Sequence, residues 1–206
     1  MIMRKTVAIV ALALALGAGT ASASSATEGR NIGKLSIGYQ GLDLNTGSGE
    51  FSISGVANGL SSRYWINNEV GIEGNLYLQS ASRKYPGSYD DERSVLAGTI
   101  KGMYAPVVKE NSRFYVGLEA GLGRVHYEQN YVDPEDFHLN ESYTNTLWLV
   151  RPLVGAEYNF AGIPELGVNF EVGYLFSGYD DSSDGSPSDT YDMSGISIGA
   201  GVHYFF

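Results

Sequence analysis

The sequence contains no cysteine, only three histidines and, beyond its N-terminal segment, no long run of apolar residues. Without cysteine there is no disulfide scaffold and no metal site built from thiolates. No later stretch approaches the roughly 18 consecutive apolar residues that a membrane-spanning helix requires. These absences exclude a disulfide-rich module and a helical membrane protein.

Basic residues are also scarce, since 13 Lys and Arg stand against 23 Asp and Glu. A nucleic-acid-binding protein needs a basic face to meet the phosphates. We therefore exclude a nucleic-acid partner.

The N-terminal segment has the three parts of a secretory signal peptide. Arg4 and Lys5 supply positive charge, residues 6–18 are apolar, and Ala21, Ser22 and Ala23 are small. We expect cleavage after Ala23, which leaves a domain over residues 24–206 with 11 basic and 23 acidic residues and a net charge of −12, because residues 1–23 hold two basic residues and no acidic one. A retained membrane anchor is the alternative, but the apolar run is too short to span about 30 Å as a helix.

The dominant pattern after residue 23 is alternation of apolar residues with small or polar ones. In the last segment one face carries Ile196, Ile198, Ala200, Val202, Tyr204 and Phe206. The other face carries Ser197, Gly199, Gly201 and His203, with Phe205 as an exception. Because successive side chains of a strand point to opposite faces, one face of this strand suits lipid and the other suits a small polar interior.

Seven upstream segments repeat the pattern, and no helical periodicity competes with it. The apolar faces of these segments begin at Leu35, Val56, Val70, Leu96, Phe114, Trp148 and Leu166. Each segment is long enough for a tilted membrane-spanning strand of about 9–11 residues. We therefore predict an all-β fold, an eight-stranded antiparallel up-and-down transmembrane β-barrel.

The predicted connections alternate in length. Those at Asn67 and Asn68, 109–112 and 161–165 are short, whereas 43–49, 82–93, 128–143 and 179–192 are longer and more polar. Outer-membrane barrels have short periplasmic turns and longer extracellular loops, so we place both termini on the periplasmic side. Outward aromatic residues near both strand ends also fit two interfacial belts. A soluble β-sandwich is the alternative, and it is disfavoured by the signal peptide and by an apolar face on every strand.

The inward faces carry charges of both signs. We expect one interior network formed by Lys34, Glu73, Lys101, Glu119, Arg151, Glu157 and Glu171. An eight-stranded barrel has an interior just wide enough for side chains to fill, and buried charges must be paired or hydrated. A plugged barrel is therefore favoured over a continuous pore.

Two of the long connections are acidic. Residues 128–143 and 179–192 each contain five carboxylates and no basic residue. The run from Asp180 through Asp184 and Gly185 resembles the start of an EF-hand loop, but Tyr191 occupies the position of the bidentate glutamate. We predict no specific metal site and no cofactor, although such acidic loops are suited to divalent cations that bridge lipopolysaccharide phosphates.

The sequence resembles the outer-membrane protein β-barrel domain family of Gram-negative cell envelopes, which includes the small OmpA-like, OmpX/Ail-like and opacity-type porins. The resemblance rests on the eight segments and on the ending Gly-Val-His-Tyr-Phe-Phe at residues 201–206. It implies that Val202, Tyr204 and Phe206 form a C-terminal signal read by the barrel assembly machinery. OmpA-type proteins continue into a peptidoglycan-binding domain, whereas the last strand expected here ends at Phe206, so we do not expect wall anchoring.

The resemblance specifies architecture better than function. It implies an integral, structural or porin-like protein of the cell outer membrane, monomeric and in contact with membrane lipid and lipopolysaccharide, that contributes to envelope integrity or limited permeability. A surface adhesin is the first alternative, because 82–93 combines Tyr85 and Tyr89 with basic and acidic residues, a mixture common at binding surfaces and in contacts with host or environmental ligands.

A lipid-modifying enzyme is the second alternative. Barrel enzymes that cleave lipid A use a serine, a histidine and an acid at the rim. The His-x-Ser pattern of the deacylases is absent, because residues 126–128 read His-Tyr-Glu. We therefore expect no catalytic residues.

Overall fold

The computed structural model describes residues 31–43, 56–85, 89–132, 138–181 and 189–206. The predicted signal peptide at residues 1–23 and most of the predicted connection at 43–49 lie outside the described residues. Within the described part of the chain, no helix has the length and apolarity needed to cross a membrane.

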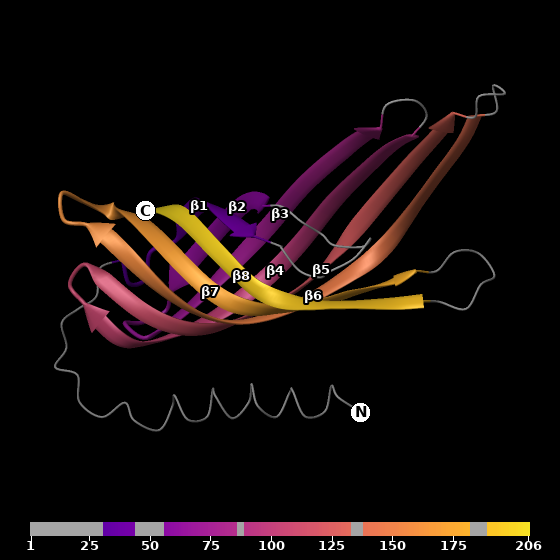
Figure 1. The fold of residues 1–206 in the computed structure, drawn as a ribbon. Helices are drawn as coiled ribbons and strands as arrows, with labels where there is room; N and C mark the ends of the chain where they lie inside the picture. Colours follow the sequence, from indigo (N-terminus) through magenta and orange to yellow (C-terminus); the bar gives the residue numbers. More distant parts are fainter. Residues whose placement is uncertain (1–30, 44–55, 86–88, 133–137, 182–188) are drawn as a thin grey trace, which may run out of the picture.

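Eight antiparallel strands follow one another around a closed ring (Figure 1). They are β1 (Ser36–Asp43), β2 (Val56–Trp65), β3 (Val70–Tyr85), β4 (Tyr89–Lys109), β5 (Ser112–Val132), β6 (His138–Phe160), β7 (Ile163–Asp181) and β8 (Asp189–Phe205). The ring closes where β1 pairs with β8, from Ser36 opposite Phe205 to Leu42 opposite Gly199. The predicted eight-stranded barrel is confirmed.

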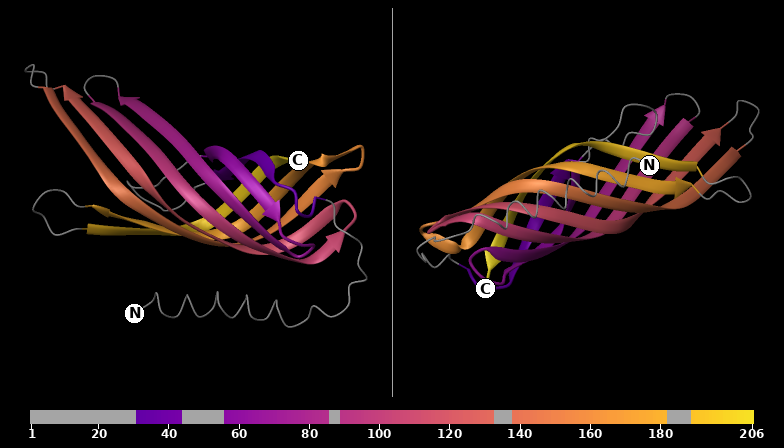
Figure 2. Two further views of the ribbon diagram at one scale, coloured as in Figure 1. Left: turned by 180° about the vertical axis from the view of Figure 1, so that it is seen from behind. Right: turned by 90° about the horizontal axis from the view of Figure 1, so that it is seen from below.

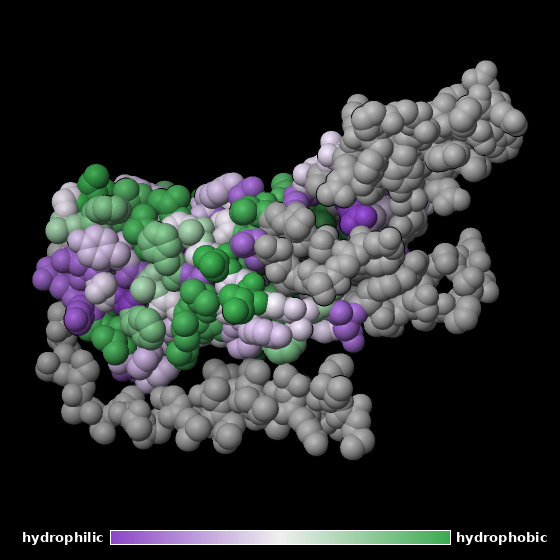
Figure 3. Space-filling model, in the orientation of Figure 1, coloured by the Kyte–Doolittle hydropathy of each residue, from purple (hydrophilic) through white to green (hydrophobic). Residues whose placement is uncertain are grey.

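Apolar alternation also places the side chains as expected. Large apolar residues on the outward positions are exposed, such as Ile100, Leu122 and Phe170. On the face seen in Figure 3, hydrophobic residues gather over the ring of strands as a band. The intervening positions are mostly buried inside the ring, including Phe205, which broke the pattern in the sequence. Such a band is what contact with hydrocarbon requires.

The turns on the side of the C-terminus are short. Asn67 organises the β2–β3 turn, because its side-chain oxygen accepts hydrogen bonds from the backbone N–H groups of Glu69 (2.8 Å) and Val70 (2.7 Å). The pairing of β4 with β5 shifts between Tyr104 and Val107. This irregularity contains Pro106, which has no N–H to donate to a sheet.

At the opposite end the strands are longer than the sequence pattern predicted. Most of 82–93 and 128–143 and half of 179–192, all expected as loops, is paired strand, for example Tyr85 opposite Tyr89 and Val132 opposite His138. The sequences of these extensions are mostly polar, so the regular apolar alternation that reveals a lipid-facing strand is missing there. Backbone pairing continues nonetheless, and β3 to β6 project beyond the ring as one sheet while β7 and β8 diverge from it (Figures 1 and 2).

The barrel interior is stacked in three layers. An aromatic floor at the C-terminal end of the ring contains Trp65, Met103, Ala105, Tyr115, Leu153 and Phe205. Above it lies a layer of charged side chains. Farther out, the interior is apolar again, with clusters that contain Leu42, Ala57, Tyr77, Ala97, Leu149 and Leu175, and then Val95, Val125, Tyr127 and Leu147.

Two inward glycines make room for the aromatic floor. A Cβ on Gly71 would lie 2.7 Å from a Trp65 ring carbon, and one on Gly155 would lie 2.6 Å from the Tyr115 ring. Trp65 and Tyr115 meet edge to face, with centroids 6.1 Å apart, a favoured aromatic geometry. The two glycines therefore let the rings of Trp65 and Tyr115 pack closely against the strand backbones and against each other.

Candidate functional site: a charged layer inside the barrel

Six of the eight strands contribute to the charged layer. It is formed by Arg63 of β2, Glu73 of β3, Lys101 of β4, Arg113 and Glu119 of β5, Arg151 and Glu157 of β6, and Glu171 of β7. All eight side chains are buried. Each occupies an inward position of its strand, so the same alternation that makes the barrel also gathers the charges.

Five members of the charged layer form one row across neighbouring strands. Arg63 is opposite Glu73, Glu73 is opposite Lys101, Lys101 is opposite Glu119, and Glu119 is opposite Arg151. The sign of the charge alternates at every step. Side chains that face each other across a strand pair lie close enough to interact directly, so this row alone pairs every member with an opposite charge.

The centre of the layer lies between Lys101 and two glutamates. The ammonium of Lys101 donates to Glu73 Oε1 at 2.6 Å and to Glu171 Oε1 at 2.7 Å. Arg63 donates through Nε to Glu73 Oε2 at 2.5 Å and through Nη1 to Glu157 Oε2 at 2.6 Å. Charge-assisted hydrogen bonds of this kind are the strong ones, and they join five strands through the lumen.

Toward the apolar outer interior, Arg151 closes the layer. Its guanidinium pairs with Glu119, at 3.2 Å from Nε to Oε2, and with Glu171. Glu119 also accepts hydrogen bonds from the hydroxyls of Thr99 at 2.6 Å and Tyr77 at 3.1 Å. The carboxylate is therefore held by neutral donors as well as by the cation.

On the side of the aromatic floor, Arg113 forms the boundary of the charged layer. Its Nη1 donates to Glu157 Oε1 at 3.1 Å, and the guanidinium carbon lies 4.5 Å from the centroid of the Trp65 ring. The hydroxyl of Tyr115 donates to Glu171 Oε1 at 2.8 Å. The floor and the charged layer are thus one connected assembly.

The layer is electrically balanced, because four cations face four carboxylates. A buried charge without a partner is costly, whereas hydrogen-bonded pairs offset much of the cost of leaving water. Balance and mutual hydrogen bonding therefore allow these groups to fill the lumen without bulk water between them.

Six of the seven residues predicted for the interior network lie in this layer. Lys34 does not: it precedes β1, is only half-buried, and forms no ion pair with the described residues. Its backbone N–H instead bonds to the carbonyl of Asn31 at 3.4 Å in a turn. The prediction placed it inside because it continued the alternation of β1 by one step beyond the strand.

The sequence prediction missed two members, Arg63 and Arg113. Arg63 lies in the segment where alternation is weakest, and Arg113 lies next to a predicted short turn. The two-residue alternation of the strand could have identified Arg63 as inward. It falls two residues after inward Ser61 and two before inward Trp65. Counting charges would also have helped, since the predicted set had more acids than bases.

Ser61, His203 and Glu73 lie together but do not form a catalytic triad. Nε2 of His203 is 2.8 Å from Ser61 Oγ, and the same nitrogen is 3.9 Å from Glu73 Oε2. A triad needs the serine and the acid on opposite ring nitrogens. All three side chains are also buried inside the ring, away from any lipid substrate.

The described residues contain no group of three or more acidic or histidine side chains placed to hold a metal ion. The carboxylates of 180–189 and the side chains of Tyr85 and Tyr89 lie outside the part whose side chains are described. The absence of a specific metal site, the contact with divalent cations bridging lipopolysaccharide, and adhesion at those positions all stay predictions.

The family model of the outer membrane protein beta-barrel domain matches residues 8–206. The chain belongs to this family. Membership makes it an outer-membrane β-barrel protein, with which the exposed apolar residues and the closed ring agree. No curated protein matches the sequence significantly.

The solved structure of OprG has the same architecture as this outer-membrane barrel. OprG from Pseudomonas aeruginosa is 16% identical, with a TM-score of 0.50, over 86% of this chain and 98% of OprG. Ail, the attachment invasion locus protein of Yersinia pestis, is 18% identical, with a TM-score of 0.49, over 84% of this chain and 97% of Ail. At such identity the likeness to OprG shows the fold alone.

Of the three residues predicted as the assembly signal, Val202 and Tyr204 lie on the outer face of β8 and Phe206 follows directly after it. Val202, Tyr204 and Phe206 are exposed toward the membrane side. Tyr204 and Phe206 meet edge to face with centroids 5.4 Å apart, and the N–H of Phe206 donates to the carbonyl of Leu35 at 2.9 Å. Recognition by the assembly machinery stays a prediction.

Proposed function

We propose that this protein is a closed outer-membrane barrel that contributes to envelope integrity rather than to diffusion through a pore. The observation that carries the proposal is the charged layer, whose eight side chains pair with one another across the lumen. A water-filled channel would leave such groups hydrated and separated, whereas here each carboxylate contacts a cation directly.

The end of the barrel below the floor supports the same proposal. Asn31 donates from its side chain to the carbonyl of Pro164 at 2.8 Å, and the N–H of Gly33 donates to the carbonyl of Trp65 at 2.9 Å. These contacts tie the segment before β1 to the end of β2 and the start of β7. Ions would therefore meet this segment, the aromatic floor and the charged layer in succession.

Planar-bilayer recording of the refolded protein tests closure. We expect no stable single-channel steps from the wild type. The double variant Lys101→Ser/Glu171→Ser keeps the charges balanced but deletes two long side chains from the centre of the layer, so together with Trp65→Ala in the aromatic floor it should admit ions. Stable wild-type steps that vanish in Lys101 or Arg151 variants would overturn the proposal, and heat-dependent gel mobility serves as the control for folding.

We also propose that the barrel is not an enzyme. The buried set of Ser61, His203 and Glu73 lacks triad geometry, and His126 on the outer face contacts Thr144 rather than a carboxylate, with Nδ1 and Oγ1 2.9 Å apart. Mass spectrometry of lipid A from cells with and without the expressed protein should show identical species. A new deacylated or acylated species that depends on the protein would contradict this.

A further inference from the structure

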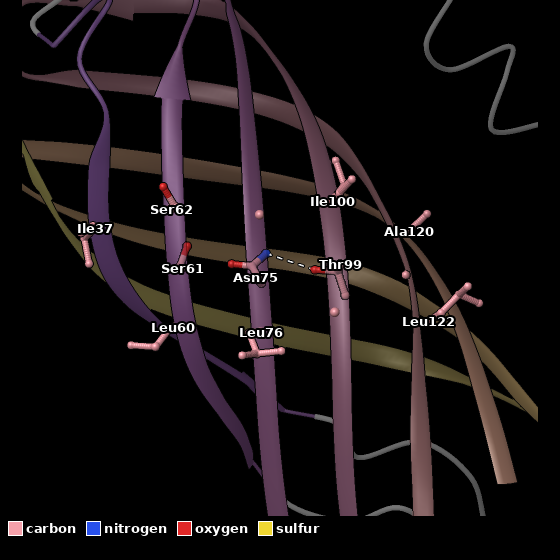
Figure 4. Close-up of a pocket in the computed structure, with 13 residues that line it drawn as sticks. Ile37, Leu60, Ser61, Ser62, Asn75, Leu76, Thr99, Ile100, Ala120 and Leu122 are labelled. Atoms are coloured by element: carbon pink, nitrogen blue, oxygen red, sulfur yellow. Dashed lines mark hydrogen bonds between the residues drawn. The ribbon is translucent and has the colours of Figure 1, made fainter.

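The lipid-facing surface carries a shallow groove of about 760 Å³ that crosses β1 to β5. Two outward rows form it (Figure 4). The row nearer the projecting hairpins runs from Leu60 through Leu76 and Gly98 to Leu122, and the next row runs from Ser62 through Gly74 and Ile100 to Ala120.

Missing side chains make the groove. A Cβ on Gly98 would meet nothing within 4 Å, and one on Gly74 would meet only a backbone oxygen at 4.0 Å. Leu76 and Leu122 stand on either side of Gly98 and are both exposed. Ser62 adds no free polar group, because its hydroxyl donates to the carbonyl of Ser36 at 2.8 Å. The groove is therefore apolar and fits a hydrocarbon chain.

An exposed cation lies directly beyond the groove on β5. Arg124 follows Leu122 on the same outward face, about 7 Å farther along the strand. It pairs across the sheet with Leu96 and Thr146, and it forms no ion pair with any residue whose side chain the structure describes. The next outward residue toward the projecting hairpins is His126, whose Nδ1 lies 2.9 Å from Thr144 Oγ1.

The height of Arg124 is that of the outer headgroups. Trp148 is the cross-strand partner of Leu122, and tryptophan favours the boundary between hydrocarbon and headgroups. One step above His126, Glu92 and Glu128 face each other on the outward side of β4 and β5. An anion is thus favoured in a band that begins at Arg124 and ends below these carboxylates.

We propose that this surface binds lipopolysaccharide, with a phosphate of its lipid A at Arg124 and an acyl chain in the groove below. The positive charge of Arg124 is complementary to that of a phosphate. Because the formal net charge of the protein is −10, a phosphate is attracted to this residue rather than to the surface in general. The site lies at the end with the long hairpins, which is the extracellular end of such barrels and faces the leaflet where this lipid resides. A groove that crosses five strands also accommodates a lipid with several chains better than one with two.

Native mass spectrometry of the folded full chain, with purified lipid A or phosphatidylglycerol added in matched detergent, tests the site. We expect lipid A to be retained over phosphatidylglycerol. Arg124→Gln should reduce its retention about fivefold, the effect of one basic side chain near a charged lipid surface. Gly98→Leu fills the groove and should reduce retention about threefold through lost chain contacts.

Gly102→Leu is the matched control, since Gly102 is an outward glycine of the same strand with open space around it that does not line the groove. It should bind lipid A as the wild type does. The proposal is overturned if Arg124→Gln and Gly98→Leu bind normally, if phosphatidylglycerol is retained equally well, or if Gly102→Leu lowers retention as much as Gly98→Leu. Dephosphorylated lipid A should lose the difference between wild type and Arg124→Gln, and persistence of that difference also counts against the phosphate contact.

Discussion

Replacing Glu171 by glutamine is expected to lower the free energy of unfolding by about 3–5 kcal/mol, the usual cost of removing one partner from a buried ion pair. Glu171 accepts from Lys101 at 2.7 Å, pairs with Arg151, and takes the Tyr115 hydroxyl at 2.8 Å. The variant leaves the layer with four cations and three carboxylates in a lumen without bulk water. Urea unfolding in lipid vesicles, followed by tryptophan fluorescence, measures the loss.

Two comparisons separate charge imbalance from general damage. Glu171→Gln/Lys101→Met restores equal numbers of cations and carboxylates, so it should regain part of the stability lost in the single variant. Glu165→Gln, on the same strand but half-buried near its start, should change stability by less than about 0.5 kcal/mol. If Glu171→Gln is as stable as Glu165→Gln, the network does not stabilise the barrel.

Removing the Trp65 side chain is expected to cost about 3–5 kcal/mol, as for other large buried aromatics replaced by alanine. Trp65 is fully buried, packs against Tyr115, and lies beneath the guanidinium of Arg113. Its loss opens a cavity in the floor and exposes one side of the charged layer. Chemical denaturation in the same vesicles, read by circular dichroism since a tryptophan is lost, gives the value.

Trp65→Phe is the control variant for Trp65→Ala. It keeps a ring over which Arg113 can lie and fills most of the space, so its cost should be clearly smaller than that of Trp65→Ala. Equal losses for the two variants would mean that the indole N–H, 3.4 Å from Glu157 Oε2, matters more than ring packing. A loss below about 1 kcal/mol for Trp65→Ala would show that the floor is not tightly packed.

The fold was predictable because membrane-spanning strands must present apolar residues at every second position. That constraint acts on the segment from Phe114 to Leu122 as strongly as on the last strand, so strand number, facing and ring closure all followed from it. It stops acting outside the membrane. The pairing of Tyr85 with Tyr89, or of Val132 with His138, therefore carried no such signature and was predicted as loop.

The interior charges were predictable for the same reason, but their partners were not. Alternation assigns Glu73 or Lys101 to the lumen, yet only strand register decides that Arg63 faces Glu73. Arg113 depended on where a turn ends, a boundary that sequence patterns locate poorly. The groove was invisible at the sequence level, because Gly74 and Gly98 become neighbours of Ala120 only through the pairing of three strands.

The alternating row from Arg63 to Arg151 also favours the correct register between neighbouring strands. A strand that enters one residue out of step turns its charge into lipid, and a strand two residues out of step leaves a buried charge opposite the wrong partner. Both errors are penalised as soon as a neighbouring strand is present, before the ring closes. The buried charges thus disfavour incorrect registers between neighbouring strands from β2 to β6. The apolar exterior cannot do this, because it changes little when a strand shifts by two residues.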